Sequence, residues 1–115
     1  MSADKKTIGI TRDNLEALQR LIINGQFGSE LDAAKFAMAH AIKAGTSAGR
    51  ADGAETKWNV GTADPDGKLR AMLMAFYPEV DEPLRLMEYL MNTGLADLAG
   101  SKTQMPDVYG IMFDK

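Results

Sequence analysis

The chain contains no cysteine among its 115 residues, and no apolar run approaches the length of a membrane-spanning helix. The absence of cysteine excludes disulfide bonds, thiolate zinc sites and thiol nucleophiles. The first six residues lack the apolar segment that a secretory signal contains. Together these absences lead us to expect a small cytoplasmic protein with no membrane span, built from one domain or two very small units.

The sequence also has few candidates for chemistry. It carries no glycine fingerprint for nucleotides, and its single histidine, His40, has no second ligand at a metal-binding spacing. Ser29 has no base partner that would make it a nucleophile. We therefore expect no metal, no cofactor and no enzymatic activity.

Charge is distributed unevenly along the chain. The net charge is −3, which argues against a generic nucleic-acid binder. Residues 1–50 carry seven basic and five acidic side chains, whereas residues 51–115 carry six basic and eleven acidic ones. The positive excess of the first segment is compatible with contact to DNA and equally with no electrostatic role.

The first segment contains one strand pattern followed by two helix patterns. Ile8 and Ile10 alternate with polar or small residues, which predicts a strand over residues 7–11. A leucine stripe predicts a helix that starts at a cap on Asp13 or Thr11 and stops at Asn24-Gly25. Ser29 is expected to cap a second, alanine-rich helix that runs to about residue 43.

The rest of the chain predicts two further helices. Glycines at three positions between residues 45 and 56 indicate a flexible connector over 46–56, and residues 57–62 read as a short extended or turn segment. Asp64-Pro65 is expected to start a helix that ends at Pro78, and Pro83 to open another that ends at Gly100. Residues 108–113 have the pattern of a further short strand. The expected class is mainly α, with units 1–45 and 57–115 either separate or joined in a single compact domain.

A lone strand ahead of two helices has no neighbour within its own segment. Unpaired backbone groups at a strand edge are costly when buried and adhesive when exposed. We therefore expect this strand to pair with the same strand of a second copy, which makes residues 1–45 a dimer former. A paired ribbon of this kind fits the major groove of DNA.

The order strand, helix, turn, helix resembles the ribbon-helix-helix family, on residues 7–11 (Thr-Ile-Gly-Ile-Thr) and 25–34 (Gly-Gln-Phe-Gly-Ser-Glu-Leu-Asp-Ala-Ala). The resemblance covers residues 5–44 and implies an intertwined dimer that binds DNA. The dimer core that it implies consists of Ile8, Ile10, Leu15, Leu18, Ile22, Leu31, Ala34 and Met38. The DNA-binding residues that it implies are Lys5, Lys6, Thr7, Gly9, Thr11, Arg12, Gly28 and Ser29.

The residues at the reading positions leave operator recognition open. Specific base contacts usually come from Arg, Lys, Asn or Gln, whereas this strand offers Thr7, Gly9 and Thr11. Nonspecific DNA contact, or none, is an equal alternative. Trp58 is compatible with stacking on a base and with anchoring a core or an interface.

A fainter resemblance covers the remainder of the chain. Residues 55–61 (Glu-Thr-Lys-Trp-Asn-Val-Gly) and the helix that closes with residues 94–100 are similar to the small E component of bacterial DNA phosphorothioation systems. That resemblance implies an accessory to a modification machinery, without a catalytic site of its own.

Two functions therefore follow as expectations. The first is a small noncatalytic DNA-associated protein, either a ribbon-helix-helix transcriptional regulator or an antitoxin-like repressor. The alternative is an oligomeric accessory or scaffold subunit of a DNA-modification or other enzyme complex, with little DNA binding of its own. In both cases we expect the protein to associate with itself, as a homodimer or a higher oligomer. The further partner is DNA in the first case and a protein bound through residues 57–115 in the second.

Overall fold

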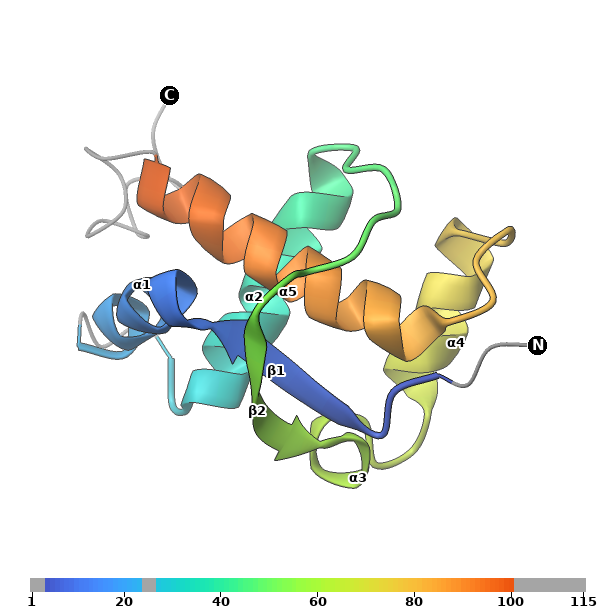
Figure 1. The fold of residues 1–115 in the computed structure, drawn as a ribbon, viewed down its shortest axis with the longest axis horizontal. Coiled ribbons are helices and arrows are strands. Elements are labelled where there is room, and N and C mark those ends of the chain that lie inside the picture. Colours follow the sequence, from blue (N-terminus) through green and yellow to red (C-terminus); the bar gives the residue numbers. More distant parts are fainter. Residues whose placement is uncertain (1–3, 24–26, 101–115) are drawn as a thin grey trace.

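Helices account for most of the residues that the structure describes, as the apolar periodicity of the two segments predicts. The computed structural model describes residues 4–23 and 27–100. In order, the elements are β1 (Thr7–Thr11), α1 (Arg12–Ile23), α2 (Glu30–Lys43), β2 (Ala54–Asn59), α3 (Val60–Ala63), α4 (Lys68–Phe76) and α5 (Pro83–Gly100) (Figure 1). The mainly α class is confirmed. Within these ranges, no helix is both long enough and apolar enough to cross a membrane.

The α2 and α5 helices cross in the middle of the molecule at a point where both are built from small residues (Figure 1). A Cβ atom added at Gly94 of α5 would overlap the carbonyl oxygen of Ala37 in α2. The backbones therefore touch without an intervening side chain. The alanine-rich pattern of α2 predicts close approach to another helix, and the partner is α5, from the distant end of the sequence.

One hydrophobic cluster contains residues from both the first and the second segment. Ile8 and Ile10 of β1 are fully buried together with Leu90 and Met91 of α5. The residues expected in the core of a dimer lie in this cluster: Ile8, Ile10, Leu18, Ala34 and Met38 are buried, and Leu15, Ile22 and Leu31 are partly buried against it.

The expectation that β1 has no strand partner in its own chain is wrong. It pairs antiparallel with β2, with Ile8 opposite Trp58 and Ile10 opposite Glu55, and an irregularity in register falls between Ile8 and Gly9. The sequence pattern missed β2 because its first three residues look like the end of a flexible connector. Glycine is required at position 9, since a Cβ there would lie 2.8 Å from the backbone oxygen of Glu55.

The other edge of β1 is closed by side chains of α5. Glu88 accepts a hydrogen bond from the amide of Gly9 at 2.7 Å. Asn92 accepts from the amide of Thr11 at 2.8 Å and donates to the carbonyl of Gly9 at 3.0 Å. A carboxylate and an amide thus replace a neighbouring strand, so the amide and carbonyl of Gly9 and the amide of Thr11 all have partners at this edge.

Helix ends in the first segment agree with the sequence. Ser29 caps α2, because its hydroxyl accepts from the amide of Asp32 at 3.1 Å. For α1 the cap is Thr11 rather than Asp13, since the Thr11 hydroxyl accepts from the amide of Asn14 at 3.3 Å. The predicted stop at Asn24-Gly25 and the predicted strand over 108–113 lie outside the described residues.

Helix starts in the second segment are capped by carboxylates that do not directly precede them in the sequence. The α5 helix begins at Pro83 as predicted, but its cap is Asp4, whose carboxylate accepts from the amides of Leu84 and Arg85 at 2.8 and 3.0 Å. The α4 helix begins at Lys68, later than the predicted Pro65. The buried Asp64 still serves it, by accepting from the amides of Leu69 and Arg70 at 3.0 Å each.

We expect Asn92→Ala to destabilise the fold strongly. The change leaves the Thr11 amide and the Gly9 carbonyl without partners at a buried edge, which costs about 2–4 kcal/mol in the free energy of unfolding. Urea denaturation followed by circular dichroism measures this. The control Gln19→Ala, on the exposed face of α1, should change stability by less than about 0.5 kcal/mol. An equal, small effect for both variants would contradict the role of Asn92.

We expect Gly94→Ala to destabilise although alanine favours helix. The gain in helix propensity is about 1 kcal/mol, but the added methyl group must push α2 and α5 apart at Ala37, which costs about 3 kcal/mol or more. The control is Gly61→Ala in α3, where a Cβ meets nothing within 4 Å. Thermal unfolding of both variants measures the difference. A Gly94→Ala protein as stable as the Gly61→Ala protein would show that the crossing is not close.

Candidate functional sites

The strand residues expected to read DNA are engaged within the chain. Gly9 is buried against the backbone of β2. The Thr7 hydroxyl lies 3.4 Å from the hydroxyl of Thr56, and the Thr11 hydroxyl caps α1. Thr7 and Thr11 remain partly exposed.

The basic residues around β1 fall into two groups. Lys5 is drawn inward, with its ammonium 3.3 Å from the buried carboxylate of Glu88. Lys6 and Arg12 are exposed, and Arg12 lies 3.5 Å from the carboxylate of Glu55 on β2. Only the exposed pair is available to attract a polyanion.

The N-terminus of α2, where Gly28 and Ser29 were expected to hold a phosphate, already carries negative charge. Glu30 and Asp32 lie in its first turn, and Glu30 pairs with Lys57 at 2.7 Å. These carboxylates complement the positive end of the helix dipole. A phosphate at the same place would meet their charge.

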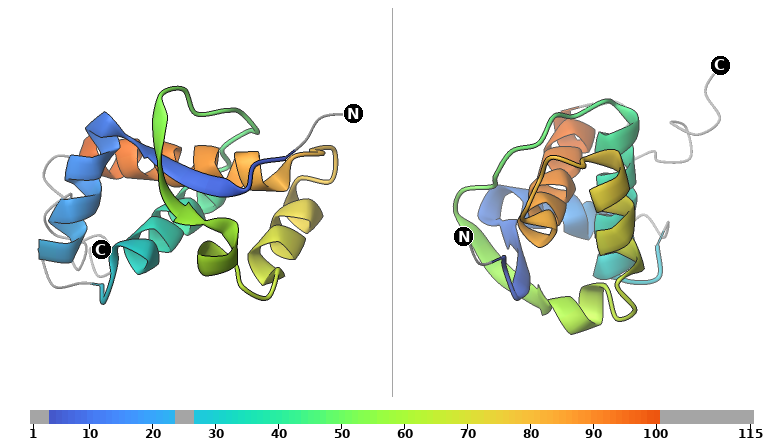
Figure 2. Two further views of the ribbon diagram at one scale, coloured as in Figure 1. Left: turned by 60° about the horizontal axis from the view of Figure 1, so that its bottom comes forward. Right: turned by 90° about the vertical axis from the view of Figure 1, so that its right-hand side faces the viewer.

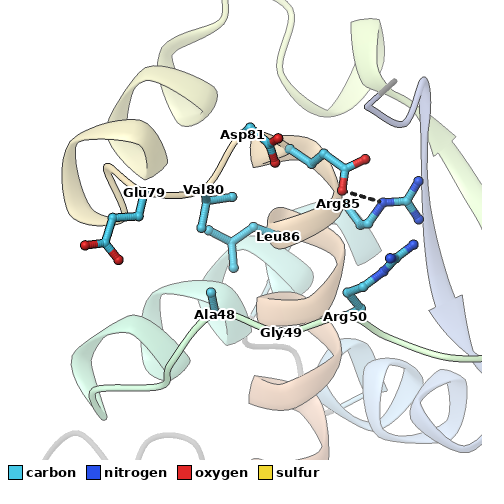
Figure 3. A pocket seen from close by; sticks show the side chains of 9 residues that line it. Ala48, Gly49, Arg50, Glu79, Val80, Asp81, Arg85 and Leu86 are labelled. Carbon is cyan, nitrogen blue, oxygen red and sulfur yellow. Dashed lines mark ion pairs between the residues drawn. The ribbon is translucent and has the colours of Figure 1, made fainter. Parts of the chain in front are cut away.

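A pocket of about 320 Å³ lies where the segment before β2 passes the first turn of α5 (Figure 3). Ala48, Val80 and Leu86 supply an apolar side. Its charged residues are Arg50, Arg85, Glu79, Asp81 and Glu82. Among these, Figure 3 places both arginines at one side of the pocket and Glu79 at the opposite side.

The two arginines of this pocket are incompletely paired. Arg85 Nε lies 3.4 Å from Glu82 Oε1, yet this buried nitrogen makes no hydrogen bond. Arg50 forms no ion pair with any described residue. In Figure 3 both arginine side chains extend in the same direction, away from Glu79.

A second pocket, of about 350 Å³ and mainly apolar, adjoins the first. Phe76, Tyr77, Pro78 and Val80 line it at the end of α4, with Ser47, Ala48 and Glu79. The Tyr77 hydroxyl donates to the carbonyl of Thr46 at 2.7 Å, which ties the segment after α2 to the end of α4. We call Met74, Phe76, Tyr77, Pro78 and Val80 the α4 surface.

Sequence reasoning missed both pockets. Arg50 lies in a segment whose composition predicts a flexible connector. Arg85 lies in a helix whose pattern predicts only an apolar, core-facing stripe. Pro78 and Pro83 predict a loop between two helices, but they do not indicate which residues that loop contacts. Trp58, left open between base stacking and anchoring, is partly buried against the core.

His40 has a partner that its position on α2 did not predict. Its Nε2 atom lies 2.6 Å from Asp97 Oδ2 on α5, and both side chains are partly exposed. In the described part of the chain, no group of three or more His, Cys, Asp and Glu side chains is placed to hold a metal ion.

In comparisons with known proteins, no family model, no curated protein and no solved structure matches this chain.

We expect the Tyr77 phenol to ionise only at strongly alkaline pH. Burial raises its pKa above 10.0, and the neighbouring Tyr89 acts in the same direction. Because the folded-state pKa is raised, the stabilisation by this phenol is fully present below pH 10.0 and is lost as the pH rises through the raised pKa.

An ultraviolet titration of phenolate absorbance measures this, as the difference between the protein and Tyr77→Phe. Tyr77→Phe should also make stability less dependent on pH in the alkaline range. Ionisation of Tyr77 at or below its ordinary pKa would contradict the burial argument.

Proposed function

We propose that this protein is an accessory or scaffold subunit that binds a partner protein through the α4 surface and carries out no catalytic step itself. The observation that carries the proposal is the exposure of large apolar side chains on α4. Met74 is 48% exposed and Phe76 is 60% exposed, and Leu73 is the only residue of this helix that is fully buried.

Phe76 adjoins a mainly apolar hollow, which is the usual setting of an energetically dominant contact. Phe76 borders the pocket that Tyr77, Pro78 and Val80 line. A partner side chain inserted there would bury Phe76 and its own apolar surface together. Contiguous apolar surface on a folded protein commonly marks an interaction site.

The closed edges of β1 favour this function over recognition of DNA by a paired ribbon. Both edges of the strand are satisfied inside the chain, by β2 and by Glu88 and Asn92. A two-chain ribbon would have to break one of these sets of hydrogen bonds. The resemblance of residues 55–61 and 94–100 to an accessory component points in the same direction.

The test is retention of partners by the tagged, full-length chain in its source cells. Phe76→Glu should lower the retention of a specific partner by about 30-fold, the effect of losing about 2 kcal/mol at a dominant contact. The matched control is Ile23→Glu, the same type of change at a residue that is 80% exposed. Figure 2 places α1, which ends at Ile23, and α4 at opposite ends of the molecule. Equal retention by Phe76→Glu and the unaltered chain would reject the α4 surface.

A DNA titration at two salt concentrations separates this function from its rival. An accessory subunit of this kind should bind duplex DNA weakly, and its complexes should persist at high salt. Tight, salt-sensitive DNA binding that is lost when Lys6 and Arg12 are changed to alanine would favour the regulator instead.

A further inference from the structure

The charged side chains of the pocket at Arg50 and Arg85 are separated: both arginines lie on one side, and the lining also contains the carboxylates of Glu79, Asp81 and Glu82. Two guanidinium groups lie on one side, and the one ion pair that either makes with a described residue is the contact of Arg85 with Glu82. Glu79 lies across the pocket, with its carboxylate directed away from the arginines in Figure 3. On the arginine side, Arg85 is paired with Glu82, whereas Arg50 has no ion-pair partner among the described residues.

Within the described part of the chain, the buried Nε of Arg85 also has no hydrogen-bond acceptor. Among the described residues, neither guanidinium donates a hydrogen bond, although Arg85 is only 26% exposed and its Nε is buried. Buried donors without partners carry a cost, which an added acceptor removes. A guanidinium presents paired N–H groups in a plane, a geometry that matches the two oxygens of a carboxylate or phosphate group.

The apolar lining of the pocket indicates that the ligand also has an apolar part. Ala48, Val80 and Leu86 are apolar and lie beside the arginines. The volume of about 320 Å³ is at the small end of the range for ligand pockets. A compact molecule fits this space if it has an oxyanion at one end and an apolar body at the other.

We propose that this pocket binds a small molecule that carries a carboxylate or phosphate group, with the oxyanion between Arg50 and Arg85 and the apolar part against Val80 and Leu86. The site goes beyond the accessory function and does not rest on it, since Arg50 and Arg85 are not part of the α4 surface. Binding would also fix the segment that bears Arg50 to the start of α5.

The probes are benzoate and phenyl phosphate, with benzamide as the neutral analogue. Amide chemical shifts in solution report binding. We expect at least one of the two anions to cause saturable shifts confined to residues 48–50 and 79–86, and benzamide to cause none. Benzoate and phenyl phosphate together distinguish a carboxylate site from a phosphate site, and binding of either supports the proposal.

Charge-removing variants test which residues hold the anion. Arg50→Gln should weaken binding about 10-fold or more, the effect of losing a charged hydrogen-bonding pair. Arg50 is exposed, so this variant should keep its fold. Arg85→Gln should act in the same direction. The matched control is Arg70→Gln on α4, an exposed arginine outside the pocket, which should bind as the unaltered chain does.

Three results would overturn the proposal. The first is the absence of saturable shifts with both anions up to about 10 mM, because a dissociation constant above that concentration would correspond to less than about 3 kcal/mol of binding free energy. The second is binding that Arg50→Gln leaves unchanged. The third is Arg50-dependent binding of a DNA duplex without binding of either small anion, which would assign these arginines to a polymer backbone.

Discussion

The fold depends on the way two side chains of α5 complete the edge of β1. Glu88 and Asn92 supply the acceptors and the donor that a neighbouring strand would supply to Gly9 and Thr11. Asn92 is held in turn by Asn14 of α1, whose side-chain amide donates to both the carbonyl and the side-chain oxygen of Asn92. The network is buried, so each group that lost its partner would be left without water to replace it. The two short strands of the described residues can in this way bury Ile8 and Ile10 without recruiting a second copy.

The same constraint decides which surfaces are available. Because β1 is used on both edges, the basic residues beside it, Lys6 and Arg12, do not extend a paired ribbon. What remains open lies near the start of α5, where Asp4 fixes the first turn and the segment before β2 passes across it. There the arginine pocket and the α4 surface adjoin, with Val80 lining both hollows. A small anion and a partner protein at these two places would therefore occupy neighbouring surfaces.

Local signals in the sequence were sufficient wherever the interaction partners are near in sequence. The cap of α2 by Ser29, the end of α2 at Lys43 and the end of α5 at Gly100 follow from residues within a few positions of each boundary. The burial of Ile8, Leu18 and Met38 followed from periodicity alone. The predictions failed at β2 and at the start of α4. Residues 54–56 have the composition of a connector, and Asp64 caps amides five and six residues further on rather than those that follow it directly.

The sequence by itself determined the mainly α class, most helix boundaries and the apolar faces that form the core, since these depend on backbone preference and on periodicities of a few residues. Only the tertiary structure decided the strand partner of β1, the cap that Asp4 provides to a helix about eighty positions away and the meeting of Arg50 with Arg85. Each of these is a contact between segments far apart in the chain. The alanines of α2 indicate that some helix packs closely there, but no local pattern says that this helix is α5 or that the contact joins Ala37 to Gly94.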